Sequence, residues 1–192
     1  MQIDAKVKYK ELEKVINALT DDIAVKVGIL AKDGNEEVSK NLDMAGLGAV
    51  HEFGCQIPVT DKMRGFFRHH FGINLRKDTT HIVIPSRSFL QKPLEKSKKF
   101  MKNIKSAIGD AEDVLYYIQK TGDIESLAIV IGGSAVDLIQ EAFDTSCWGE
   151  WEPDKELTVS NKIKKEEQRE TAKPLINTGY LRSKINYEVE KR

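Results

Sequence analysis

Apolar and polar residues follow two different periods along this chain, and each change of period marks an expected element. Apolar residues at every second position predict strands, in the segments 3–9, 23–31, 80–84 and 185–189. Apolar residues three and four positions apart predict amphipathic helices, in the segments 10–19, 43–53, 88–108, 111–121 and 123–143. The helices are gathered between widely separated strands, which is typical of an α+β domain and not of repeating βαβ units.

The expected architecture is a single α+β domain over 1–192, with a small antiparallel sheet of about four strands packed against three to four helices. A chain of 192 residues, 40% of them hydrophobic, is long enough to bury a substantial core. Segments 55–80 and 145–173 do not show a sustained apolar period. We therefore expect two long protruding loops there, since loops of this length usually serve contacts or remain mobile.

The segment 43–54 is expected to form a short helix with clear end signals. Asp43 can cap its start, and Gly54 can take the left-handed backbone that closes a helix. His51 and Glu52 are expected near the rim of the packed face. The buried side of this helix is expected to consist of Leu47, Val50 and Phe53.

A second segment, 84–90, reads Ile-Pro-Ser-Arg-Ser-Phe-Leu. Pro85 should end the preceding strand, because proline lacks the N–H that a strand ladder needs. A helix should begin at Ser88, with Phe89 as a core anchor. We also expect Arg87 to form an ion pair with Glu52 across the junction of the two segments.

The two expected loops carry candidate contact residues. In 55–80, basic side chains stand beside phenylalanines, which suits anchoring of a protein neighbour, packing of an internal hairpin on the sheet, or stacking on nucleic-acid bases. In 145–173, two tryptophans stand among polar residues. The side chains expected to contact another subunit are Arg64, Phe66, Phe67, Trp148 and Trp151.

The charge balance and the absence of targeting patterns indicate which compartment and which partners to expect. Thirty basic residues balance thirty acidic ones, so no global attraction to nucleic acid or to an anionic membrane is expected. The lysines in 92–105 are expected on a solvated helix face, with weak binding to DNA or an acidic partner as the alternative. We see no signal peptide, no apolar run near 20 residues and no disulfide framework in two cysteines, so a cytoplasmic protein is expected.

No pattern in the chain indicates catalysis, a metal site or a cofactor site. His69 and His70 are adjacent, so on a regular element their side chains diverge and do not clamp one ion. Gly132-Gly133-Ser134 lacks the phosphate-loop pattern. A nucleophile at Cys55 with His51 as its base is conceivable, but nothing in the sequence orients the histidine. We therefore expect a non-enzyme without cofactor or metal.

Four segments, in this order, resemble the virion-morphogenesis proteins of Mu-like tailed phages, the tail-completion or neck family. Ala49 to Gly54 resembles the family's Glu-Phe-Gly signature, with His51, Glu52, Phe53 and Gly54. Segment 58–64 also looks typical. Segment 84–90 resembles its Ile-Pro-Ala-Arg-Pro-Phe-Leu element through Pro85, Arg87 and Phe89, with serine at positions 86 and 88. Segment 173–181 resembles its Lys-Pro-Leu-Ile-Asp-Thr-Gly element through Pro174, Leu175, Thr178 and Gly179, with Asn177 in place of aspartate.

The resemblance implies a small structural subunit without catalysis. Its copies would join in a ring at the head–tail junction or the tail end, in contact with tail-tube and head-connector proteins. It would reside in the host bacterial cytoplasm during assembly and in the virion afterwards. The alternative from another class is a nucleic-acid-binding adaptor that uses the basic 92–105 helix and the aromatic 64–71 loop.

Overall fold

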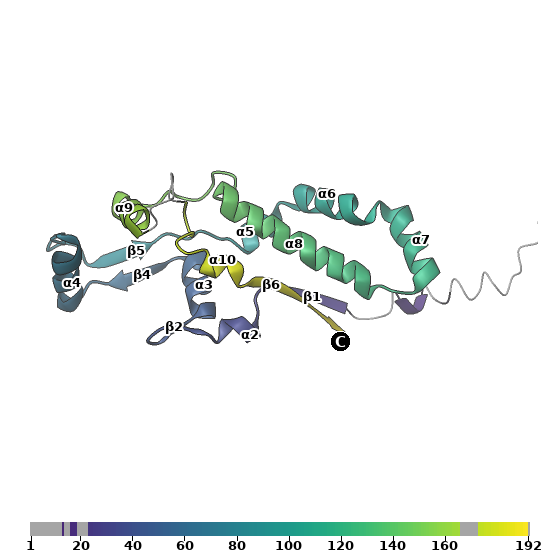
Figure 1. Cartoon of the computed structure of the whole chain (residues 1–192), viewed down its shortest axis with the longest axis horizontal. Helices are drawn as coiled ribbons and strands as arrows, with labels where there is room; N and C mark the ends of the chain where they lie inside the picture. The colour runs from purple at the N-terminus through teal and green to yellow at the C-terminus, as the bar shows by residue number, and fades with distance from the viewer. Residues whose placement is uncertain (1–12, 14–15, 19–22, 166–172, 192) are drawn as a thin grey trace, which may run out of the picture.

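A computed structural model describes residues 13, 16–18, 23–165 and 173–191, and its overall shape is elongated (Figure 1). The strand predicted at 3–9 and most of the helix predicted at 10–19 lie outside these residues. At the centre, strands β1 (Ile23–Ile29) and β6 (Ile185–Lys191) pair antiparallel, in a register from Ile23 opposite Lys191 to Ile29 opposite Ile185. Both strands were predicted from their alternating pattern.

The longest helix, α8 (Glu125–Thr145), packs on this pair of strands. Gly132 in its middle lies under the ring of Tyr187 of β6, where an added Cβ would meet the ring at 2.3 Å. The absence of a side chain at Gly132 therefore makes room for an aromatic ring. By length and composition α8 could cross a membrane, and 44% of its most apolar window is buried inside the protein.

Two further strand pairs are separate from the central one. Strand β2 (Glu37–Ser39) pairs with β3 (Leu42–Asp43), and β4 (Cys55–Pro58) pairs with β5 (His81–Ile84). The α+β class is confirmed, but the described residues form three two-stranded sheets instead of one sheet of about four strands. Alternation predicts where strands lie, whereas their pairing depends on contacts between residues far apart in the chain.

Both segments expected to be loops contain helices. Segment 55–80 holds β4 and α4 (Asp61–Phe71), and segment 145–173 holds α9 (Glu156–Lys165). The remaining helices are α2 (Ala31–Gly34), α3 (Met44–Phe53), α5 (Gln91–Glu95), α6 (Ser97–Ile108), α7 (Ala111–Thr121) and α10 (Tyr180–Ser183). Residues 55–84, with β4, α4 and β5, form an arm that extends from one end of the body (Figure 1).

The main core lies where α8, α3 and the 87–94 segment meet. Phe89 and Phe143 are fully buried, with ring centroids 5.4 Å apart, and Phe143 lies edge-on to Trp151 at 5.5 Å. Phe89 is thus confirmed as a core anchor. Trp151 is only 5% exposed, so the expectation that it contacts another subunit is wrong: its ring completes the core, and its indole N–H donates to the carbonyl of Ser88.

A smaller core attaches α7 at the other end of the molecule. Ala18, Ile118 and Leu127 are buried together. The helix begins with a reciprocal capping box between Asp110 and Asp113 and ends at Gly122 in the left-handed conformation. The break and new start predicted at Gly109-Asp110 are confirmed. The body therefore carries the arm at one end and α7 at the opposite end (Figure 1).

Candidate functional site

The carboxylate of Glu52 joins the end of α3 to the start of α5. Oε1 accepts hydrogen bonds from Ser88 Oγ at 2.6 Å and Gln91 N at 3.0 Å, and Oε2 accepts from Phe89 N at 2.7 Å and Leu90 N at 2.9 Å. Glu52 is 5% exposed, so the position expected near the rim is wrong. Four donors replace the water that this buried charge loses, which is the condition for burying it at tolerable cost.

The backbone beside Glu52 is held just as closely. Ser86 Oγ donates to the carbonyl of Glu52 at 2.7 Å, and Arg87 N donates to the carbonyl of His51 at 2.8 Å. Gly54 has a positive φ of +74°, as predicted, but its ψ of 167° differs from the left-handed helical conformation. An added Cβ would stand 2.8 Å from Ser86 N. Only glycine fits here without displacing backbone. The Phe53 side chain is 74% exposed, so its predicted role as a core anchor is wrong.

Arg87 is buried, but its partner is not Glu52. Its Nη2 lies 2.9 Å from Asp154 Oδ1, and its Nε donates to the carbonyl of Glu152 at 2.9 Å. Lys162 of α9 lies 2.6 Å from Asp154 Oδ2 and also donates to the carbonyl of Lys173. The expected ion pair between Glu52 and Arg87 is therefore replaced: Glu52 binds backbone N–H groups, and Arg87 fixes the chain that leads into α9.

The 173–179 segment lies on the other side of this network. Pro174 is buried, Ile176 belongs to the main core, and Leu175 has a left-handed backbone with φ +61°. Thr178 Oγ1 accepts from Tyr180 N, and Gly179 at φ +79° precedes α10. Within the described residues, three of the four resembling segments thus converge on the junction between body and arm, while 58–64 lies at the tip of the arm.

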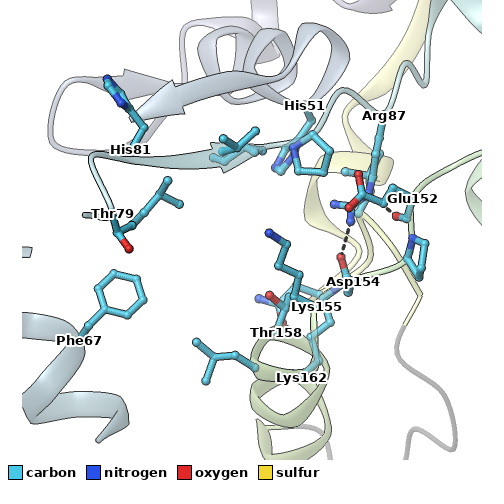
Figure 2. Close-up of a pocket in the computed structure, with 18 of the residues that line it drawn as sticks. His51, Phe67, Thr79, His81, Arg87, Glu152, Asp154, Lys155, Thr158 and Lys162 are labelled. Carbon is cyan, nitrogen blue, oxygen red and sulfur yellow. Dashed lines mark hydrogen bonds and ion pairs between the residues drawn. The ribbon is translucent and has the colours of Figure 1, made fainter. Parts of the chain in front are cut away.

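A cavity of about 610 Å³ opens between β5 and α9 at this junction. Figure 2 shows Phe67 and Thr79 on one side, His51 and Arg87 on the other, and Lys155, Thr158 and Lys162 of the α9 region below. Its walls are largely apolar, and the charged groups lie at one end around Asp154. The apolar side chains that line it are Phe67, Leu75, Ile82, Val83, Ile84, Pro85, Pro153, Leu157 and Leu175.

His51 is the titratable group whose environment in this cavity is most altered. Burial lowers the pKa of its imidazole below the ordinary value of 6.5, and the positive charge of Arg87 lowers that pKa further. The side chain is therefore neutral at pH 7. Its buried Nδ1 has no hydrogen-bond partner among the described residues. A neutral imidazole can act as a base, but among the described residues no nucleophile is hydrogen-bonded to its Nδ1.

The two cysteines lie in different parts of the fold. Cys55 is half-buried in β4, opposite Ile84 of β5, and Cys147 is fully buried in the main core. Burial raises the pKa of the Cys147 thiol, which keeps it protonated. In the described part of the chain, no three His, Cys, Asp or Glu side chains are grouped to hold a metal ion.

The tip of the arm is ordered by Arg64. Its guanidinium donates to the carbonyls of Leu75, Arg76 and Thr79 at 3.3, 2.8 and 2.8 Å. Arg64, which was predicted to contact another subunit, thus holds the segment that leads from α4 back to β5. Phe66, which is 49% exposed, and Phe67 lie edge-on with ring centroids 6.1 Å apart.

Trp148 and the basic helix face each other. The Nζ atoms of Lys96 and Lys99 each lie 4.8 Å from the centroid of the Trp148 ring. Lys99 is paired with Glu141, and Lys96 lies 2.5 Å from Glu150. The pKa of Lys96 is raised by its hydrogen bond with Glu150. Two lysines of the 92–105 segment are thus engaged within the chain, which leaves fewer of them for an external polyanion.

Several residues of the junction lacked a sequence signal. Glu152 and Asp154 contact Arg87, and Lys162 contacts Asp154, only because the fold brings α9 beside the arm. Helix α4 did carry a signal, because Thr60 caps Met63 N and Gly72 closes the helix with φ +66°. A threonine and a glycine twelve residues apart would have marked both of its ends.

Comparisons of the chain with protein-family models, with curated proteins and with solved structures found no match.

Proposed function

We propose that this chain is a structural subunit of a tailed phage or prophage particle, of the tail-completion or neck class, without a catalytic role. Its copies associate in a ring at the head–tail junction or the tail end. Its further partners are tail-tube and head-connector proteins, and its location is the host cytoplasm during assembly and then the virion.

This proposal rests on the structural role of two of the resembling segments, 49–54 and 84–90. Glu52, Gly54 and Ser86 hold two backbones together, and Arg87 fixes the segment before α9. Such hydrogen-bonded junctions position one part of a fold against another. Residues needed for chemistry would instead present reactive atoms to a substrate. The junction therefore supports a role in which the arm is held in a defined direction.

The arrangement of the lysines weighs against the nucleic-acid alternative. Lys96 and Lys99 are paired with carboxylates, and the phenylalanines of α4 stack on one another and on His70. A salt titration against single- and double-stranded DNA discriminates between the two functions. Micromolar affinity with a steep salt dependence would favour the adaptor, whereas the structural function predicts no such binding.

The direct test of the proposed function is deletion of the gene from a phage that carries it. We expect electron microscopy of the lysate to show heads and tails that stay separate, or tails with abnormal ends. A plasmid copy of the wild-type chain should restore joined particles, and the empty plasmid is the control. Normal joined particles from the deletion phage would contradict the proposed function.

A further inference from the structure

Two exposed aromatic patches occupy opposite ends of the molecule. The first, the arm-tip patch, consists of Phe66, His70 and Phe71 on α4. Phe66 lies 4.4 Å from the His70 ring and 5.7 Å from the Phe71 ring, and all three side chains are exposed. Three aromatic side chains gathered on one exposed helix are typical of a contact surface and not of solvated chain.

The second, the α7 patch, consists of Glu112, Leu115, Tyr116 and Lys120. These residues are three or four positions apart and therefore share one face of the helix. Leu115 is 51% exposed and Tyr116 is 62% exposed. Lys120 Nζ lies 5.6 Å from the centroid of the Tyr116 ring. This patch is thus also aromatic, with charge at its margin.

The two ends carry opposite charge. Residues 61–78 contain two acidic residues and five basic ones, Lys62, Arg64, Arg68, Arg76 and Lys77, none of which forms an ion pair with a carboxylate among the described residues. Residues 110–125 contain one lysine and five acidic residues, Asp110, Glu112, Asp113, Asp123 and Glu125. Glu125 pairs with Lys191 of β6, so the net negative charge of this end comes from Asp110, Glu112, Asp113 and Asp123.

We infer that the arm-tip patch of one copy docks on the α7 patch of the next copy. The patches lie at opposite ends of the long axis (Figure 1), so they do not meet within one chain. Their apolar residues and opposite charges are complementary, which favours each patch for the other over itself. A contact between two different patches is heterologous, and its repetition leads to a ring or a filament and not to a symmetric dimer.

This inference deepens the proposed ring assembly and rests on it for its biological purpose. Two helices of eleven residues, α4 and α7, make an interface at the small end of the range for specific contacts. We therefore expect weak association of the full-length wild-type chain, which becomes detectable by sedimentation velocity at high protein concentration. It should weaken as salt is raised, because the charges at both patches are exposed.

The decisive experiment uses two single variants and their mixture. Phe66→Ser removes the centre of the arm-tip patch, and Tyr116→Ser removes the centre of the α7 patch. Each variant alone should lose self-association by about tenfold or more, the usual effect of truncating a central aromatic anchor. Each variant keeps one intact end, so an equimolar mixture should form a one-to-one complex that does not grow further. Val38→Ser, at an exposed apolar position of β2, is the control and should associate as wild type.

The outcomes separate this contact from other arrangements. If Tyr116→Ser associates as wild type, or if the mixture stays monomeric, the inferred contact is wrong. A monomeric wild-type chain at every concentration also overturns it. Phe53→Ser, which changes a side chain that is 74% exposed at the root of the arm, reports whether loss of association follows from the patch or from general loss of apolar surface. Circular dichroism establishes that each variant is folded.

The contact and the proposed function fail in different ways. Association of the purified chain that the two variants abolish, together with normal particles from the deletion phage, would leave the contact standing and overturn the phage function. Unjoined heads and tails from the deletion phage, with a purified chain that never associates, would support the phage function and overturn the contact.

Discussion

Glu52 shows how one buried carboxylate can determine the position of a whole segment. A glutamate without partners at 5% exposure would strongly destabilise the fold, because a buried charge needs compensation. Here the compensation comes from three consecutive backbone N–H groups and one hydroxyl. Glutamine keeps the size of the side chain but turns an N–H₂ donor toward groups that are themselves donors.

We predict that Glu52→Gln lowers the free energy of unfolding by about 2–4 kcal/mol, since hydrogen bonds to a charged group are lost and buried donors are left unsatisfied. Urea denaturation of the full chain measures this. Glu37→Gln on the exposed strand β2 is the matched control and should change stability by no more than about 0.5 kcal/mol. Equal stability of Glu52→Gln and wild type would show that the junction does not depend on the carboxylate.

The half-buried His51 makes stability depend on pH. Burial and Arg87 lower the pKa of His51 in the folded state below the ordinary value. As pH falls through about 6.5, the unfolded chain takes up a proton that the folded chain does not, so stability is lost. We predict a steeper loss of stability from pH 7 to pH 5 for wild type than for His51→Gln.

The measurement is urea denaturation at several pH values, with His69→Gln, at an exposed position, as the control that keeps the wild-type slope. Parallel slopes for wild type and His51→Gln would contradict this prediction.

Predictions for single residues succeeded where the local backbone determines the conformation. They failed where contacts with distant parts of the chain determine which side chains are buried. The position of Gly54 follows from how helices end, and φ +74° agrees. Phe53 was placed in the core because it continues the apolar spacing of α3, yet it is exposed while Glu52 is buried. The donors that bury Glu52 lie 36 to 39 residues further along the chain, and no local pattern reports them.

At the scale of elements, α8 and its contact with β6 are the centre of the body. Gly132 and Gly133 are neighbours in one helix but meet different surroundings. A Cβ at Gly132 would overlap the Tyr187 ring, whereas a Cβ at Gly133 would have no atom within 4 Å. Substitution of Gly132 therefore tests close packing, and substitution of Gly133 tests helix propensity.

We predict that Gly132→Ala lowers the free energy of unfolding by about 1–3 kcal/mol through overpacking. Gly133→Ala should raise it by up to about 1 kcal/mol, because alanine is favoured over glycine in a helix interior. Thermal or urea unfolding of both variants gives the comparison. A stabilising effect of Gly132→Ala would mean that Tyr187 does not pack on α8 as described.

Two helices that the sequence did not reveal, α4 and α9, have polar surroundings. Helix α4 lies at the tip of the arm and has no buried residue, so it lacks the apolar stripe on which helix prediction depends. Helix α9 is attached through the ion pair of Lys162 with Asp154. Strands β1 and β6 were evident, because each alternates over seven residues.

Asp154→Ala leaves Arg87 and Lys162 without their shared carboxylate. Because removal of one partner of a buried ion pair leaves uncompensated charge, we predict a loss of about 3–5 kcal/mol. The substitution should also increase the rate of hydrogen exchange, and the increase should be larger in α9 than in α8, since α9 is held by this network. Asp144→Ala, which removes the half-exposed partner of Arg182, is the control. Unchanged exchange in α9 would contradict this role of Asp154.

At the scale of the whole molecule, the fold consists of a central body with a different element at each end. The junction around Glu52 and Arg87 fixes the arm at one end, and the small core around Ile118 fixes α7 at the other. Composition predicted balanced charge overall, but not that positive and negative groups are separated between the ends, because this depends on where the fold places each helix. An elongated subunit with different ends is suited to head-to-tail assembly.

The central claim is that this chain is a structural part of a phage particle, and immunogold labelling of purified particles tests it most directly. An antibody against the full chain should label intact particles at one place, the head–tail junction or the tail end. A chain that is present in the lysate but absent from purified particles, with no label at either place, would contradict the claim.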